Sequence, residues 1–330
     1  MASIVSAGNV PTVSRQPPIR IGARGSKLSL AQSGLMQARI AAALGAAPGE
    51  EEAYAPLIPI VTSGDRIQDR RLMEIGGKGL FTKEIEEALL DGRIDCAIHS
   101  LKDMPAELPP GLVLAATPER EDPRDAFISP VCARLEDLPH GARLGTASLR
   151  RQAQALHVRP DLQIVMLRGN VDTRLAKLER GEADAILLAQ SGLNRLGLGH
   201  LPNSWLDPVA CPPAPGQGAL VIETRLEDVG ADWLEAVRCR PTTICVAAER
   251  GALFALEGSC RTAVGAHAVL DGPKLSMIVE ALTPDGARRF RRQGETTLDG
   301  ADDIAAARAL GLSLGAAVRA EGGDALILPD

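Results

Sequence analysis

The stretch ARLGTASLRRQAQALH, residues 142–157, carries the local pattern that decides the fold. Its first four residues predict a short strand, and residues 148–157 predict a helix with two arginines in its first turn. The same order follows directly downstream, where residues 164–167 predict a strand and residues 171–180 predict a helix. Strands that alternate with helices in this way are typical of α/β domains with mostly parallel or mixed sheets.

The alternation continues toward the N-terminus. Residues 20–23 begin a predicted strand, and the helix that follows spaces apolar residues three or four apart, which places them on one face. These residues are Leu28, Ala31, Leu35 and Ala38. A further helix is predicted over residues 81–91, and the remaining predicted strands cover residues 57–62, 94–99, 112–116 and 183–189.

The segment CPPAPGQGAL, residues 211–220, marks a change in character along the chain. Its three prolines and two glycines exclude a helix, so we interpret it as a hinge or a segment that crosses between domains. Beyond it, residues 242–256 and 301–319 predict helices, and residues 264–270 and 275–282 predict two strands joined by the turn sequence DGPK. These elements predict a small α+β domain at the C-terminal end.

Six arginines stand where an apolar run gives way to Gly, Ser, Thr or Asn. They are Arg24, Arg150, Arg151, Arg168, Arg174 and Arg195. A helix N-terminus attracts anions, and a guanidinium binds a carboxylate through two parallel hydrogen bonds. A single arginine of this kind is most simply a solvated charge at a helix end. Because six share the same kind of position, we predict a cleft that binds an anion with several carboxylates.

Two further residues suggest chemistry. Asp103, in HSLKDMP, follows the predicted strand 94–99 at its carboxyl end, which faces the ligand crevice in open α/β sheets. It could cap a helix, or it could stabilise a developing cation or move a proton. Cys260, in LEGSCRT, has small neighbours and an adjacent arginine that favours the thiolate. Cys96 and Cys245, by contrast, lie inside apolar runs that predict burial.

Composition excludes several classes of protein. The chain has 36 Lys and Arg against 42 Asp and Glu, a net charge of −6, and only 2% aromatic residues, so neither phosphate attraction nor base stacking favours nucleic acid. No apolar stretch approaches ~18 residues, so no membrane span is predicted. The six cysteines form no CxxC pair and no His is spaced for zinc, so we predict no metal site and a cytoplasmic protein with reduced thiols.

The sequence GGKGLF, residues 76–81, superficially suggests a phosphate-binding loop. It lacks the GxxxxGK[ST] spacing, and no GxGxxG follows a predicted strand. We interpret these glycines as a flexible loop that precedes a helix and acts as a lid. Residues 1–18 lack the features of a secretion signal and are expected to be a disordered leader.

Taken together, these residues resemble the porphobilinogen deaminase family, also called hydroxymethylbilane synthase. The resemblance runs from about residue 19 to the C-terminus and rests on eight motifs in order. They are RIGARGSKLSLAQ (20–32), GGKGLFTKEIE (76–86), HSLKDMP (99–105), EREDPRDAF (119–127), GTASLRR (145–151), LRGNVDTRL (167–175), PAPGQGA (213–219) and LEGSCR (256–261).

The resemblance implies roles for individual residues. Cys260 would carry a dipyrromethane cofactor through a thioether, and Asp103 would be the catalytic carboxylate. The cofactor's acetate and propionate groups would be held by Lys102, Ser148, Arg150, Arg151 and Arg174. The incoming porphobilinogen or the growing chain would be bound by Arg24, Ser26, Arg168, Arg174 and Arg195. Lys78 would lie on the lid loop, and Gln217 in the crossing between domains.

The resemblance also implies a reaction. Four porphobilinogen molecules would condense stepwise, head to tail, onto the dipyrromethane primer with loss of ammonia, and hydrolysis would release hydroxymethylbilane. The product would be a precursor of haem and other tetrapyrroles, and the enzyme a transferase. Porphobilinogen would be the small-molecule partner of a protein that is expected to be a monomer.

The fold implied is α/β. Two domains like those of periplasmic binding proteins would flank a cleft, and a small α+β domain would carry the cofactor cysteine. Domain 1 would comprise residues 19–118 and 216–238, domain 2 residues 119–215, and domain 3 residues 239–330. Two α/β lobes and a hinge would also suit a non-catalytic binding protein for a small polycarboxylate anion. Such a protein needs neither Cys260 nor a third domain, which favours the enzyme.

Overall fold

We describe the fold from a computed structural model, in which residues 17–66, 82–256 and 262–326 are described. The chain divides into two compact units, one of residues 1–69, 77–121 and 219–243, the other of residues 70–76, 122–218 and 244–330. Two of the predicted site residues, Lys78 and Cys260, lie outside the described residues, as does most of the expected leader.

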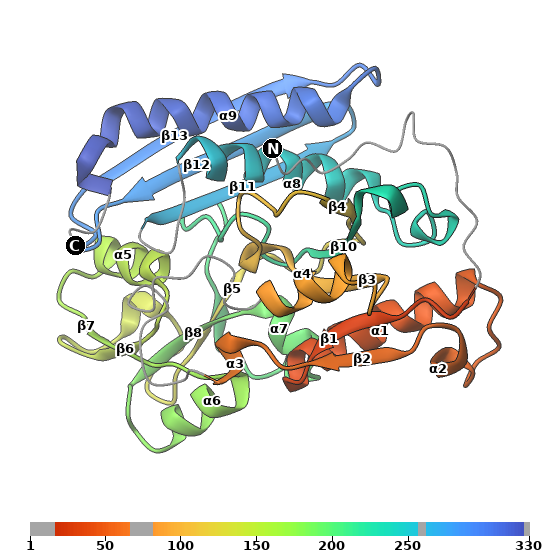
Figure 1. Ribbon diagram of the computed structural model, residues 1–330. Helices are drawn as coiled ribbons and strands as arrows, with labels where there is room; N and C mark the ends of the chain where they lie inside the picture. Colours follow the sequence, from red (N-terminus) through yellow and green to blue (C-terminus); the bar gives the residue numbers. More distant parts are fainter. Residues whose placement is uncertain (1–16, 67–81, 257–261, 327–330) are drawn as a thin grey trace. The chain divides into compact units, whose positions relative to one another are not determined.

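The first unit contains a mixed five-stranded sheet in the order β2-β1-β3-β10-β4 (Figure 1). Its strands are β1 (Ile21–Arg24), β2 (Leu57–Ile60), β3 (Cys96–Ser100), β4 (Leu112–Ala116) and β10 (Leu220–Arg225). β1 is parallel to β2 and β3, whereas β10 is antiparallel to β3 and β4. The chain therefore returns to this sheet after a long excursion, directly beyond the segment 211–220.

Helices cover both faces of this sheet. They are α1 (Lys27–Ala43), α2 (Glu51–Tyr54), α3 (Ser63–Arg66) and α4 (Lys83–Leu90), with short 3-10 turns η2 (Leu101–Asp103), η4 (Leu226–Asp228) and η5 (Asp232–Leu234). Met36 and Ile40 of α1 share an apolar cluster with Cys96 and Ile98 of β3. Ala97, which points to the opposite face of the same strand, packs in a second cluster with α4.

The apolar face that the sequence spacing marks on α1 is not the face that is buried. Leu35, assigned to that face, is 51% exposed, and Ala38 is exposed as well. The buried residues of the helix are Ser29, Gln32, Ser33, Met36, Ile40 and Ala41. Apolar periodicity misled here because small and apolar residues occur around the whole helix, and its first turns bury polar side chains instead.

The second unit contains another mixed five-stranded sheet, in the order β7-β6-β8-β5-β9. Its strands are β5 (Asp125–Ile128), β6 (Arg143–Gly145), β7 (Gln163–Val165), β8 (Ala185–Ala189) and β9 (Ser204–Trp205). The helices around it are α5 (Leu149–Val158), α6 (Val171–Glu179) and α7 (Gln190–Arg195), with the 3-10 turn η3 (Leu135–Asp137). The two predicted strand–helix repeats, β6-α5 and β7-α6, are confirmed.

A three-stranded antiparallel sheet completes this unit (Figure 1). It comprises β11 (Ala263–Asp271), β12 (Lys274–Leu282) and β13 (Arg289–Thr297), and the helices beside it are α8 (Arg240–Ala255) and α9 (Asp303–Gly322), which leads into η6 (Gly323–Leu326). Gly311 lets α9 approach α8 closely, because a Cβ there would lie 1.8 Å from the carbonyl oxygen of Ala248. The predicted α+β character of this part is confirmed, although β13 was not predicted.

Together, the two five-stranded sheets with their helices and the smaller C-terminal sheet confirm the predicted α/β class. None of the helices in the described ranges is both long and apolar enough to cross a membrane.

Candidate active site

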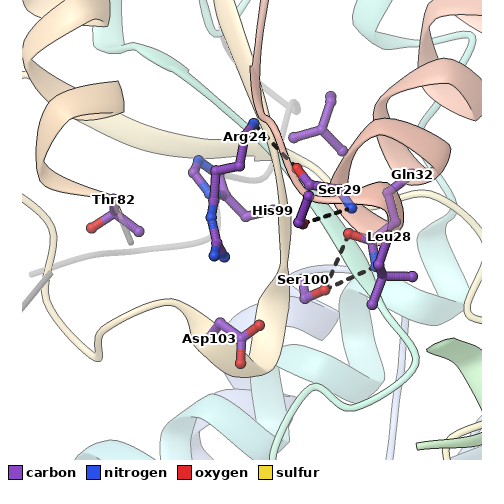
Figure 2. A pocket seen from close by; sticks show the side chains of 10 residues that line it. Arg24, Leu28, Ser29, Gln32, Thr82, His99, Ser100 and Asp103 are labelled. Carbon is purple, nitrogen blue, oxygen red and sulfur yellow. Dashed lines mark hydrogen bonds between the residues drawn. The ribbon is translucent and has the colours of Figure 1, made fainter. Parts of the chain in front are cut away.

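A pocket in the first unit lies where β1, β3 and the start of α1 meet (Figure 2). β1 and β3 are parallel neighbours, so the residues that follow their carboxyl ends are brought to the same edge of the sheet. The pocket is lined by Arg24, Ser26, Leu28, Ser29, Gln32, Thr82, Ile98, His99, Ser100 and Asp103.

Arg24 and Asp103, which the sequence assigned to different tasks, line the same pocket. Arg24 is the last residue of β1, and Asp103 ends η2, the turn that follows β3 directly. Figure 2 shows the guanidinium of Arg24 and the carboxylate of Asp103 both directed into the cavity. Asp103 is exposed and Arg24 is half-buried, so a ligand can reach both side chains.

The N-terminus of α1 forms one wall of this pocket. Ser26 is the N-cap, with its side chain accepting a hydrogen bond from the backbone N–H of Ser29 at 3.3 Å. The Oγ of Ser29 accepts in turn from the backbone N–H of Arg24 at 3.2 Å. The first turn of this 17-residue helix therefore lies beside Arg24, and its partial positive charge adds to that of the guanidinium.

Other polar residues of the pocket were missed by the sequence reasoning. Gln32 Nε2 donates to the Oγ of Ser100 at 3.0 Å, which joins α1 to the end of β3. His99 lines the pocket and its Nε2 lies 3.0 Å from Oε2 of Glu223 on β10. The signal was present, since Gln32, His99 and Ser100 belong to the motifs RIGARGSKLSLAQ and HSLKDMP.

A second group of predicted residues meets in the second unit, around Asp125. Arg150 Nη1 donates to Oδ2 of Asp125 at 2.6 Å, and Arg151 donates to Oδ1 through Nη2 at 2.7 Å and Nε at 3.0 Å. Gln217 Nε2 also donates to Oδ1, at 2.9 Å. Although burial alone would raise the pKa of Asp125, the two guanidiniums hold it well below its usual range.

This cluster keeps an excess of positive charge. Asp125 carries one negative charge against the two positive charges of Arg150 and Arg151, each of which is 5% exposed. Arg150 Nε is buried and has no hydrogen-bond partner among the residues that the structure describes. Asp125 was not predicted as a site residue, although it lies within the motif EREDPRDAF.

Three further predicted residues of the second unit, Ser148, Arg168 and Arg195, lie at or near the ends of helices. Ser148 is the N-cap of α5 and accepts from the backbone N–H of Arg151 at 3.4 Å. Arg168 lies two residues before Asn170, the N-cap of α6, and its buried Nη1 has no partner within the described ranges. Arg195 ends α7 and its Nη2 donates to the carbonyl of Gly218 at 2.6 Å.

The predicted site residues are therefore divided between the two units. Arg24, Ser26 and Asp103 share the pocket of the first unit, and Lys102 precedes Asp103 in η2 without lining that pocket. Arg150, Arg151 and Gln217 share the Asp125 cluster of the second unit. Arg174 lies in the middle of α6 and is half-buried.

Comparison with known proteins shows which family the chain belongs to. Residues 19–232 match the family model described as porphobilinogen deaminase, dipyromethane cofactor binding domain, and residues 243–320 match porphobilinogen deaminase, C-terminal domain. The chain is 87% identical over 322 residues to a porphobilinogen deaminase of Caulobacter vibrioides, covering 96% of this chain and 100% of the relative. A porphobilinogen deaminase of Phenylobacterium zucineum is 70% identical over 317 residues, 95% of this chain and 99% of that protein.

A solved structure, a periplasmic substrate-binding protein of an ABC transporter from Coxiella burnetii, has a TM-score of 0.42 at 16% identity and covers 67% of this chain and 90% of that chain. On its two family matches and its relatives, the chain belongs to the porphobilinogen deaminase family.

Proposed function

We propose that this protein is a porphobilinogen deaminase. It condenses four porphobilinogen molecules, head to tail, onto a covalent dipyrromethane primer with loss of ammonia, and it releases hydroxymethylbilane by hydrolysis. The observation that carries this proposal is the pocket that brings Arg24 and Asp103 to one edge of a sheet, in a chain of this family.

Arg24 and Asp103 have complementary tasks in this reaction. Porphobilinogen carries two carboxylates, and Arg24 beside the N-terminus of α1 offers a site for one of them. Loss of ammonia leaves a positive charge on a pyrrole-derived carbon. The carboxylate of Asp103, directed into the same cavity, stabilises that charge.

The residues of the second unit fit a cofactor that carries several carboxylates. The Asp125 cluster retains a net positive charge, and the buried Arg150 Nε and Arg168 Nη1 lack partners within the described part of the chain. An anion would satisfy such donors. We assign the cofactor's acetate and propionate groups to Lys102, Ser148, Arg150, Arg151 and Arg174, its attachment to Cys260, and substrate contacts to Arg24, Ser26, Arg168, Arg174 and Arg195. When bound, the dipyrromethane supplies the pyrrole carbon to which the first substrate is joined.

The localisation, the oligomeric state, the roles of Lys78 and Gln217 and the domain boundaries also remain proposals. We infer a cytoplasmic monomer, with Lys78 on a lid loop and Gln217 in the crossing between domains. We retain the division into residues 19–118 with 216–238, residues 119–215, and residues 239–330. The return of β10 to the sheet of the first unit supports a discontinuous first domain.

Incubation of the purified protein with porphobilinogen tests the proposed function. We expect ammonia release and a linear tetrapyrrole, detected as uroporphyrin after acid closure and oxidation, together with a mass that exceeds that of the polypeptide by a dipyrromethane. Binding of porphobilinogen without ammonia release would instead favour the alternative of a non-catalytic polycarboxylate-binding protein.

A further inference from the structure

A polar cluster interrupts an apolar interface behind the pocket. In the antiparallel pairing of β3 with β10, Ala97 lies opposite Glu223, and His99 lies two residues further along on the same face. That face is covered by α4, since Ala97 packs with Ile85 and other apolar residues of this helix. His99 and Glu223 are therefore placed in an environment that is otherwise built for apolar side chains.

His99 and Glu223 are bonded to each other and almost fully buried. His99 Nε2 lies 3.0 Å from Oε2 of Glu223, with side chains that are 6% and 0% exposed. The other carboxylate oxygen of Glu223, Oε1, has no hydrogen-bond partner among the residues described. An unsatisfied buried oxygen is unfavourable, so the pair is not explained by stability alone.

A second buried carboxylate belongs to the same cluster. Glu86 lies in the first turn of α4, is 7% exposed, and its Oε1 also lacks a partner in the described ranges. Burial raises the pKa of Glu86 above its ordinary value, although the side chain of Thr82 lowers it; the charge of Glu223 raises it further, and His99 lowers it. Glu223 contacts the imidazole of His99 directly, and Glu86 lies on the helix that covers the same face of the sheet.

The cluster reaches the pocket through two residues. His99 lines the pocket together with Arg24 and Asp103 (Figure 2). Thr82 lines it as well, and its carbonyl accepts from the backbone N–H of Glu86 at 2.8 Å. A purely structural tie between strands could be made by apolar side chains at no loss of stability, whereas a buried pair of ionisable groups has to offset its desolvation.

We propose that His99, Glu223 and Glu86 form a proton relay that accepts the proton released at the pocket during each condensation. The inference rests on the proposed function. When porphobilinogen enters as its ammonium form, the C–N bond breaks and ammonia leaves with the electron pair. The pyrrole α-carbon of the growing chain forms the new C–C bond and then loses its proton, whose bonding electrons return to the ring. The imidazole of His99 takes this proton, the Glu223 carboxylate stabilises the imidazolium, and solvent finally receives the proton.

Other charged groups face the relay from neighbouring elements. Arg24 on β1 and Asp103 on η2 share the pocket with His99, and Glu87 on α4 acts on Glu86 in the same direction as Glu223.

The relay is tested first by His99→Gln. A glutamine amide can still donate to Glu223, which preserves the structural contact, but it cannot take up a proton. We expect kcat to fall by about 100-fold or more, the range that general acid–base groups contribute, with little change in KM or in the melting temperature. Glu223→Gln should lower kcat by roughly tenfold, with little change in KM, because the imidazolium loses its anionic partner.

A second measurement needs neither cofactor nor turnover. Infrared spectra recorded as the pH is raised from acid to neutral should contain the carbonyl band of a protonated carboxyl group that persists above the usual titration range of a glutamate and is absent in Glu86→Gln. Asp95→Asn is the matched control, since Asp95 is also a buried acid of the first unit, is paired with Arg20 and Arg225, and does not line the pocket. It should lower the melting temperature and leave the band unchanged.

Turnover by folded His99→Gln within a few-fold of wild type would overturn the relay, as would the absence of a band that depends on Glu86. Failure of the wild-type protein to release ammonia would instead count against the proposed function, and the infrared band would still report on the cluster.

Discussion

Arg150 Nη1 lies 2.6 Å from Oδ2 of Asp125, and both side chains are buried. Arg151 holds the other oxygen of the same carboxylate and also donates through Nη1 to the carbonyl of Leu187 at 2.9 Å. The two guanidiniums are therefore fixed before any ligand arrives, which lowers the entropy that an anion must offset on binding. Asp125 positions these arginines and leaves part of their charge for a ligand.

Asp125→Asn should destabilise the protein strongly. The change leaves two buried guanidiniums without their carboxylate, and breaking a buried ion pair typically costs about 3–5 kcal/mol. Asp137→Asn is the control, because its partner Arg134 is largely exposed and such pairs contribute about 0–1 kcal/mol. Urea unfolding at neutral pH measures the loss of unfolding free energy in both variants. Equal losses in Asp125→Asn and Asp137→Asn would contradict the structural role of Asp125.

The difference in stability between wild type and Asp125→Asn depends on pH, and the direction of this dependence can be predicted. The folded-state pKa of Asp125 is depressed, so its charge stabilises the fold above the unfolded-state pKa of about 3.9. This stabilisation is lost as pH falls below that value. The gap in stability between wild type and Asp125→Asn should therefore be full at neutral pH and shrink below about pH 4.

Arg150 and Arg151 should tolerate Lys better than Leu. If they hold cofactor carboxylates, Lys keeps the charge but loses the two-bond geometry, whereas Leu loses both. We expect the fraction of protein that carries the dipyrromethane, measured by intact mass, to fall far more with Leu. The exposed Arg289 is the control position. Mild and similar effects at all three positions would show that the pair is not part of the cofactor site.

The strand–helix units could be predicted because their signals are local. Strand β4 was predicted with the bounds that the structure gives it, and Ser148 was predicted as the start of α5, since apolar runs and capping residues act within a few positions. The strand β13 was missed because its sequence, RFRRQGETT, is largely polar and only Phe290 is buried. Tertiary pairing with β12 holds that strand in place.

The candidate site was predicted only in part, because several of its contacts join residues that lie far apart in the sequence. The arginines carry a visible signal, but their partner Asp125 lies 25 positions before Arg150 and nothing local links them. Glu223 similarly lies 124 positions from His99. Such pairs become visible only when strands and helices have been placed beside each other.

Cys260→Ser should abolish the covalent modification. Cys211→Ser is the control, because burial, with Glu280 and Asp125 nearby, raises the pKa of the Cys211 thiol to about 11 and keeps it protonated at neutral pH. A thiol is a far weaker nucleophile than a thiolate. Intact mass should show the dipyrromethane on wild type and on Cys211→Ser, and not on Cys260→Ser. Retention of the added mass in Cys260→Ser would place the attachment elsewhere.

Glu280→Gln should raise the melting temperature at neutral pH. Burial raises the pKa of Glu280 in spite of Gln154, Arg291, Arg289 and Arg150, so the fold disfavours its charged form. When folding raises the pKa of an acid, the protein loses stability as the pH rises from the unfolded-state pKa, about 4.3 for Glu, through the folded-state pKa. The gain from Gln should therefore be present at neutral pH and vanish below about pH 4, as thermal melts at both pH values can show. A lower melting temperature at neutral pH would contradict this reading of the Glu280 environment.

Asp103→Asn should bind porphobilinogen and keep the fold, yet lose several orders of magnitude in turnover. Asn retains the size of the side chain but not its charge, and only the charge stabilises the pyrrole-derived cation in the pocket that Asp103 shares with Arg24. Each factor of ten lost corresponds to roughly 1.4 kcal/mol of barrier. Asp103→Glu keeps the charge and displaces it by one methylene, so it should retain more activity than Asn.

Single-turnover ammonia release measures both variants, with circular dichroism as the control for folding. Because Asp103 is exposed at the end of η2, neither change should lower the melting temperature by more than a few degrees. If folded Asp103→Asn turns over within a few-fold of wild type, Asp103 serves only to shape the turn, and the catalytic assignment is wrong.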